Sequence, residues 1–197
     1  MDGHFYALLA RMRYIQRWAL MRNTEPENIQ EHSHMVAILA HALALLQNKH
    51  FGGHIDPGQA VLLALYHDAT EILTGDLPTP IKYYNPALRA SYKEVEETAA
   101  NRLERLPEEL RGDYAPYLLH PDPELEAVVK AADKLDAYLK CVKERKAGNG
   151  EFQTAQVQIW DALQANPLPA LGYFIQHYLP SFELTLDQLN GSTHTMF

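Results

Sequence analysis

The residues best suited to chemistry gather in one short stretch, from His67 to Asp76. An apolar run, Ala60 to Tyr66, leads directly into His67 and Asp68, two strong metal-binding side chains at positions where a buried helix would continue with core residues. If the helix runs on, Glu71 follows His67 by four residues, and one surface then carries an imidazole and two carboxylates. Desolvated carboxylates need a cation or several hydrogen bonds to stay ionised. The stretch therefore predicts a divalent metal site.

Further ligands must come from other helices, and His32 and a later aspartate are suitable. His32 shares a helical face with the apolar residues that follow it, so we expect it to point inward. Asp133 and Asp136 both lie beside the apolar stripe of one helix, and their spacing alone does not choose between them. Two imidazoles and two carboxylates suit a transition metal better than Ca or Mg and leave positions open for water and an anionic oxygen. Coordination positions that the protein leaves open on the metal indicate a catalytic rather than a structural site.

Apolar residues at helical spacing predict the elements that carry these side chains. Asn28 and Glu31 form the pattern of a capping box that begins the second helix, and Gly75 should stop the central one. Between Pro107 and Pro123 we expect a short helical stretch at most. No convincing strand pattern occurs, so the prediction is an all-α fold in one domain, residues 1–197, with a disordered tail after about residue 190. The other helices are expected at 4–21, where Arg17 and Trp18 would close the helix, and at 87–106, 124–145, 151–164 and 171–179.

Composition limits the classes of function. With 197 residues, 47% of them apolar, the chain can fill the core of one domain. A net charge of -8 argues against a general nucleic-acid binder, although one or two placed basic residues suffice for a small anion. The single cysteine, Cys141, excludes an internal disulfide and fits a reducing cytoplasm. Neither a secretion signal nor a membrane-spanning stretch is recognisable, so we expect a cytoplasmic protein without membrane partners.

Four segments, in order, resemble the motifs of the HD-domain phosphohydrolases, a superfamily named for a pair like His67-Asp68. Within that superfamily the chain is most similar to the bacterial 5'-deoxynucleotidase (YfbR-like) family, from the first helix to residues 181–189. The resemblance implies an HD-domain helical bundle, a homodimer, and hydrolysis of deoxyribonucleoside 5'-monophosphates with one divalent metal per subunit, such as Co or Mn. The segments are RWALMRN at 17–23, ENIQEHSHMVA at 27–37, YHDATEILTGDLPTPIKY at 66–83 and KAADKLDAYLKC at 130–141.

The resemblance also implies a role for individual residues. It favours Asp133 over Asp136 as the last ligand. Arg17 matches the residue that orients the substrate phosphate, and Trp18 the one that crowds the ribose 2' position. Glu71 matches the catalytic carboxylate, and Asp76 or a water would protonate the leaving 5' oxygen. The implied metal ligands are His32, His67, Asp68 and Asp133, and the implied substrate-binding loop comprises Asp76, Leu77, Pro78 and Thr79.

Two other functions fit the same motifs. One is an HD hydrolase for a ribonucleotide, a cyclic nucleotide or a guanosine polyphosphate, which Trp18 opposes if it guards the 2' position. The other is a nucleotide sensor that keeps the metal for structure alone, which the presence of Arg17 and Glu71 opposes. Taken singly, each site residue also has an ordinary structural explanation, such as a core histidine or a turn cap. The site is predicted from their joint occurrence.

Overall fold

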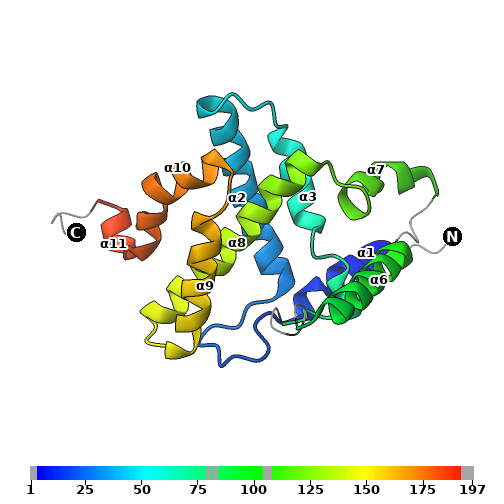
Figure 1. The fold of residues 1–197 in the computed structure, drawn as a ribbon, viewed down its shortest axis with the longest axis horizontal. Coiled ribbons are helices and arrows are strands. Elements are labelled where there is room, and N and C mark those ends of the chain that lie inside the picture. The colour runs from blue at the N-terminus through cyan, green and yellow to red at the C-terminus, as the bar shows by residue number, and fades with distance from the viewer. Residues whose placement is uncertain (1–3, 79–80, 82–83, 104–107, 192–197) are drawn as a thin grey trace.

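Two long helices, α2 (Ile29–His50) and α8 (Pro123–Lys146), form the centre of the fold. The structure, a computed structural model, describes residues 4–78, 81, 84–103 and 108–191. Figure 1 shows α9 and α10 on one side of this pair and α7 on the other, with α1 and α11 at opposite ends of the molecule. The other described helices are α1 (Phe5–Leu9), η1 (Ala10–Tyr14), α3 (Pro57–Tyr66), α4 (Glu71–Thr74), α6 (Pro86–Leu103), α7 (Glu108–Leu118), η2 (Gly150–Phe152), α9 (Gln153–Gln164), α10 (Pro169–His177), η3 (Leu179–Glu183) and α11 (Leu186–Leu189).

Helix α2 begins and packs as its sequence predicts. The Asn28 side chain accepts hydrogen bonds from the amides of Gln30 and Glu31, each at 3.1 Å, and the Glu31 carboxylate accepts one from the Asn28 amide at 3.3 Å. This capping box satisfies donors that the first turn leaves free. One face of α2 is fully buried against α3, α8 and α10, and His32 lies on that face with 1% of its surface exposed.

The predicted helix over residues 4–21 is wrong beyond Tyr14. Helix α1 tightens into the 3₁₀ helix η1, and Ile15 is extended, with φ -92° and ψ 111°. Gln16 then forms an isolated bridge with Asn28, while the Arg17 amide donates to the Glu27 carbonyl at 2.9 Å. The backbone groups that a longer helix would have paired internally are paired instead with the segment that leads into α2. Arg17 and Trp18 therefore lie on a loop.

The central helix is also interrupted. Helix α3 ends at Tyr66, residues 67–70 form a turn, and α4 begins at Glu71. Hydrogen bonds from the Ala69 amide to the Tyr66 carbonyl (2.9 Å) and from the Glu71 amide to the Asp68 carbonyl (3.0 Å) close this turn one residue more tightly than an α-helix does. Glu71 thus begins a separate helix and does not continue the one that precedes His67. The predicted stop at Gly75 is confirmed, since α4 ends there with φ 73°.

The remaining differences concern helix bounds. A helix of 11 residues, α7, occupies the segment expected to be mostly irregular, although Pro116 lies inside it and cannot donate a backbone hydrogen bond. The helix predicted at 87–106 is α6, whose described part ends at Leu103, and residues 104–107 lie outside the described residues. The predicted disordered tail falls mostly on 192–197, which also lie outside them. Across the described ranges no β-strand occurs, in agreement with the all-α prediction, and no helix there is long and apolar enough to span a membrane.

Candidate active site

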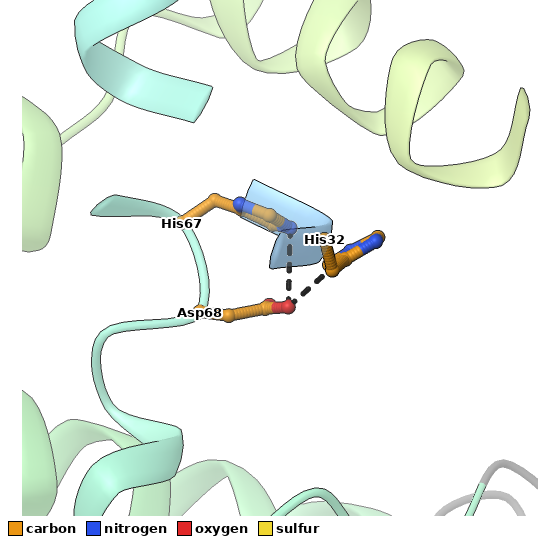
Figure 2. A group of neighbouring side chains, drawn as sticks. All are labelled: His32, His67 and Asp68. Carbon is orange, nitrogen blue, oxygen red and sulfur yellow. Dashed lines mark ion pairs between the residues drawn. The ribbon is translucent and has the colours of Figure 1, made fainter. Parts of the chain in front are cut away.

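His32, His67 and Asp68 converge where α2 meets the turn after α3. Their ligand atoms all lie within 4.8 Å of one another. The Oδ2 atom of Asp68 is 3.2 Å from Nε2 of His67 and 3.5 Å from Nε2 of His32. Figure 2 shows the carboxylate of Asp68 directed at both imidazoles, with His67 and Asp68 from one turn and His32 from a separate helix. The break in the central helix therefore does not separate the pair from His32.

The two nitrogens of His32 distinguish Asp133 from Asp136. Oδ1 of Asp133 is 3.2 Å from Nε2, on the side of Asp68, whereas Oδ2 of Asp136 is 2.6 Å from Nδ1. Asp136 is only 7% exposed and contacts the opposite edge of the ring. A histidine that binds a metal through one ring nitrogen commonly donates a hydrogen bond from the other nitrogen to a carboxylate, and this bond orients the ring. The geometry thus favours Asp133 as a ligand and Asp136 as the group that orients His32.

These side chains fit a divalent cation. Nε2 of His32 and Nε2 of His67 are buried and make no hydrogen bond to any described residue. Nδ1 of His67 lies 2.7 Å from the carbonyl oxygen of Ala64, which can only accept, so Nδ1 carries a proton and Nε2 is the nitrogen available to coordinate a metal. Two orphaned imidazole nitrogens beside two carboxylates are the donor set of a transition metal rather than of Ca or Mg.

The electrostatics of the cluster favour positive charge. Burial alone would lower the pKa of His67, but the nearby Asp68 carboxylate raises it to about 9. Burial alone would raise the pKa of Asp133, yet its contact with His32 and the charges of His67 and Arg17 hold it below the usual range. The pKa of Asp68 is likewise lowered, because His67 outweighs the effect of burial. A cation placed among these groups would be stabilised in the same way.

Arg17 lies beside the candidate metal ligands, within a second acidic group. Its side chain is 12% exposed, and its Nη1 atom is 2.5 Å from Oε1 of Glu27 and 2.6 Å from Nδ1 of His32. Burial alone would lower the pKa of Arg17, but Glu27, Asp133 and other carboxylates raise it. Although Glu27, His32 and Asp136 offer atoms close enough for a metal, the guanidinium already lies among them. We therefore interpret this second group as an ion-pair network that holds Arg17.

Glu71 and Asp76 are two carboxyl groups with raised pKa values. Burial, followed by the charges of Asp68 and Asp76, raises the pKa of Glu71 to about 9, and its Oε2 atom is buried without a hydrogen bond to any described residue. Burial also raises the pKa of Asp76, while Arg17 and a hydrogen bond with the Trp18 backbone act in the opposite direction. Carboxyl groups tuned in this direction are suited to transferring protons near neutral pH.

A cavity of about 640 Å³ opens beside the cluster. That volume accommodates a nucleotide-sized ligand. Trp18, Asp76 and Pro78 line it with Arg17, whereas Leu77 is half-buried outside the lining, and Thr79 lies outside the described residues. Helices α8 and α9 form a further wall, in which the sequence had indicated only Asp133. Its lining residues are Asp133, Lys134, Ala137, Ala155, Gln158, Ile159 and Ala162.

Sequence reasoning missed several side chains that support the site. Glu27 pairs with Arg17, and the buried pair Lys140–Glu144 lies further along α8. One signal was available: Asp133, Asp136, Lys140 and Glu144 follow at steps of three and four residues, which places polar groups along one face of a helix otherwise packed in the core. Glu27, the partner of Arg17, had no comparable signal in the sequence. Its pairing with Arg17 depends on the bridge between Gln16 and Asn28, which brings the two segments together.

Comparison with solved structures identifies the class of protein. An HD-domain phosphohydrolase from Listeria innocua matches with a TM-score of 0.78 at 22% identity, covering 91% of this chain and 88% of that one. A cyanophage S-2L HD phosphohydrolase, solved with dA and one catalytic Zn²⁺ ion, matches with a TM-score of 0.60 at 23% identity, covering 91% and 96%. The chain has the HD-domain phosphohydrolase fold.

Sequence comparison identifies the family. The model of the YfbR-like 5'-deoxynucleotidases matches residues 4–182. The 5'-deoxynucleotidase of Vibrio parahaemolyticus is 51% identical over 192 residues, 96% of this chain and 99% of that protein. That of Shewanella oneidensis is 50% identical, covering 95% and 98%. The chain belongs to the YfbR-like 5'-deoxynucleotidase family, and it is a metal-dependent phosphohydrolase with 5'-deoxynucleotidase activity.

Proposed function

We propose that His32, His67, Asp68 and Asp133 hold one divalent transition metal, such as Co or Mn, for the hydrolysis of deoxyribonucleoside 5'-monophosphates. The observation that carries this proposal is the convergence of three ligand atoms within 4.8 Å, two of them orphaned imidazole nitrogens. The single Zn²⁺ ion of the cyanophage enzyme supports one ion per subunit. When bound, such an ion polarises a phosphate oxygen and lowers the pKa of a bound water.

The side chains around the ion would bind the phosphate, activate the water and protonate the leaving group. Arg17 binds the phosphate oxygens and offsets their charge as the bond to the sugar oxygen breaks. Glu71 orients or deprotonates the attacking water, a role supported by its position near Asp68 and by its buried Oε2 atom, which makes no hydrogen bond to any described residue. Asp76 or a water would protonate the leaving 5' oxygen, and burial shifts the pKa of Asp76 in the direction that favours its protonated form. Pro78 and Leu77, with Thr79, would form the loop that holds the nucleotide.

Trp18 is proposed to exclude ribonucleotides. Its indole lines the cavity and packs against Phe152 with 5.3 Å between ring centroids, so its position is limited by packing. A rigid ring rejects an added hydroxyl by bulk more strongly than an attractive contact does.

A cytoplasmic homodimer is the proposed state of the protein. The helix α6 supports a dimer, because its apolar residues Leu88 and Val95 are 37% and 49% exposed. A cytoplasmic location is supported by Cys141, a free and buried thiol. The dimer is tested by light scattering, where Val95→Glu should yield monomers if α6 forms the interface.

The test of the site is phosphate release from metal-stripped protein. Deoxy- and ribonucleoside 5'-monophosphates are supplied with Co, Mn or Mg added back, using Asp68→Ala as the inactive control. We expect metal-dependent release from the deoxy substrates, a loss of about 100-fold or more in kcat for Glu71→Ala with unchanged metal content, and access of ribonucleotides in Trp18→Ala. Full activity of Glu71→Ala would remove that residue from the mechanism.

A further inference from the structure

A stripe of polar residues continues along α8 beyond the metal site. Lys140 and Glu144 lie on the same helical face as Asp133 and Asp136, and they are 3% and 1% exposed. Their side chains form an ion pair with 2.5 Å between Nζ and Oε1. Buried charges of this kind are costly unless they are well bonded. The catalytic scheme uses neither of them, so their position needs another explanation.

Both members of the pair bond to the loop that follows Trp18. Oε2 of Glu144 accepts hydrogen bonds from the Thr24 amide at 2.9 Å and from the Thr24 hydroxyl at 2.6 Å. Nζ of Lys140 donates to the Glu25 carbonyl at 2.5 Å. Burial alone would raise the pKa of Glu144. The hydrogen bonds from Lys140 and Thr24 outweigh burial and hold that pKa below its usual range. The carboxylate therefore stays ionised and bonded to this loop.

A second set of bonds extends the connection to Trp18 itself. Nδ2 of Asn149 donates to the Arg22 carbonyl at 2.7 Å and to the Glu144 carboxylate at 2.8 Å. Within the loop, Nδ2 of Asn23 donates to the Met21 carbonyl at 2.9 Å and to the Trp18 carbonyl at 3.3 Å. Arg22, Thr24 and Glu25 are thus bonded to Asn149, Glu144 and Lys140. Asn23, the neighbour of Thr24 in the chain, bonds the carbonyls of Met21 and Trp18 within the loop.

The backbone of Trp18 requires such support. Its φ is 59°, in the left-handed region, where a bulky residue is strained. Such strain persists only where surrounding contacts determine the conformation. The indole contacts the Phe152 ring, and Nζ of Lys140 lies 5.5 Å from the centre of that same ring. The network therefore supports both the backbone and the ring of Trp18.

We propose that Glu144, with Lys140 and Asn149, is a positioning group that fixes the loop of residues 18–25 and thereby sets how strictly the cavity rejects ribose. The inference rests on the proposed role of Trp18 as the guard of the 2' position. Glu144 does not line the cavity and acts only through the loop. A purely structural role would reduce turnover of both sugars equally, whereas a positioning role changes their ratio.

The experiment compares kcat/KM for dAMP and AMP in the metal-loaded enzyme. In Glu144→Gln we expect the deoxy-to-ribo ratio to fall about tenfold, and in the milder Thr24→Val, at an exposed position, about threefold. Leu171→Ala is the matched control, since it removes a buried core side chain away from this network and should lower stability without changing the ratio. If Glu144→Gln does not fold, the ratio in Thr24→Val decides.

A second readout separates this inference from the role of Trp18. In a Trp160→Phe background Trp18 is the only tryptophan, and Glu144→Gln should increase its quenching by acrylamide. If Trp18→Ala lowers the ratio but Glu144→Gln and Thr24→Val keep it, the positioning role is overturned and the role of Trp18 stands. If Trp18→Ala leaves the ratio unchanged, the guard role fails, and with it the effect proposed for Glu144 on sugar selection. Unchanged quenching in Glu144→Gln would overturn the positioning itself.

Discussion

Replacing Asp136 tests how the structure separates the two aspartates of α8. Asp136 contacts Nδ1 of His32 at 2.6 Å, while Asp133 lies 3.2 Å from Nε2 of the same ring. If Asp136 only orients the ring, its loss should weaken metal binding without abolishing it. If Asp133 is a ligand, Asp133→Asn should lose stoichiometric binding.

The expected size of the effect follows from what each replacement leaves. Losing a carboxylate that orients a ligand histidine costs about 10- to 100-fold in metal affinity. Asp136→Asn keeps an oxygen that can accept from Nδ1, so we expect about 10-fold, near 1.4 kcal/mol. Asp136→Ala leaves Nδ1 facing Nη1 of Arg17 at 2.6 Å, a group that can only donate. Nδ1 would then accept, the proton would move to Nε2 and block coordination, and the loss should approach 100-fold.

The assay is a competition titration of metal-stripped protein with Co or Mn against a chromogenic chelator. Thermal unfolding of each variant shows whether its fold is intact. Affinity like that of the wild type in Asp136→Ala would refute the orienting role. Retention of metal by Asp133→Asn, together with its loss in Asp136→Asn, would reverse the assignment of the two residues.

Three further outcomes follow from particular residues. Gly75→Ala should cost about 1–3 kcal/mol of stability, because the backbone conformation at φ 73° and ψ 162° is accessible essentially to glycine alone. It should also lower kcat, because the strain would displace Asp76. Denaturant unfolding and steady-state kinetics measure the two effects, and unchanged values for both would contradict the prediction. Cys141 is buried, and burial raises the pKa of its thiol to about 12, so iodoacetamide should label it only after denaturation; rapid labelling of native protein would show that the thiol is accessible. Glu144 has a pKa below the ordinary carboxyl value of 4.5, so its contribution to stability is complete above that value and is lost as pH falls toward the lowered pKa. The stability difference between wild type and Glu144→Gln should therefore narrow on acidification below about pH 5, measured by denaturant titration, and a difference that widened would contradict the ion pair.

Periodicity and capping predicted the parts of the fold that depend on neighbours along the chain. The capping box of Asn28 and the buried face of His32 are local properties of α2, and both appear in the structure. The choice between Asp133 and Asp136 could not be made this way, because both lie beside the same apolar stripe. What separates them is which edge of the His32 ring each one meets, and that depends on how α2 and α8 pack.

Arg17 and Trp18 show why residue types were easier to predict than the backbone that carries them. The spacing of apolar residues continues into this segment, so local preference alone extends the helix through both. The observed path depends on the bridge of Gln16 with Asn28, the pairing of Arg17 with Glu27, and the hydrogen bonds that Thr24 donates to Glu144. These contacts join residues far apart in the chain, and only their sum can offset a left-handed tryptophan. Predictions from local sequence patterns should therefore be wrong where a site depends on strained backbone. In this chain the wrongly predicted segment carries Trp18, the residue proposed to select the substrate.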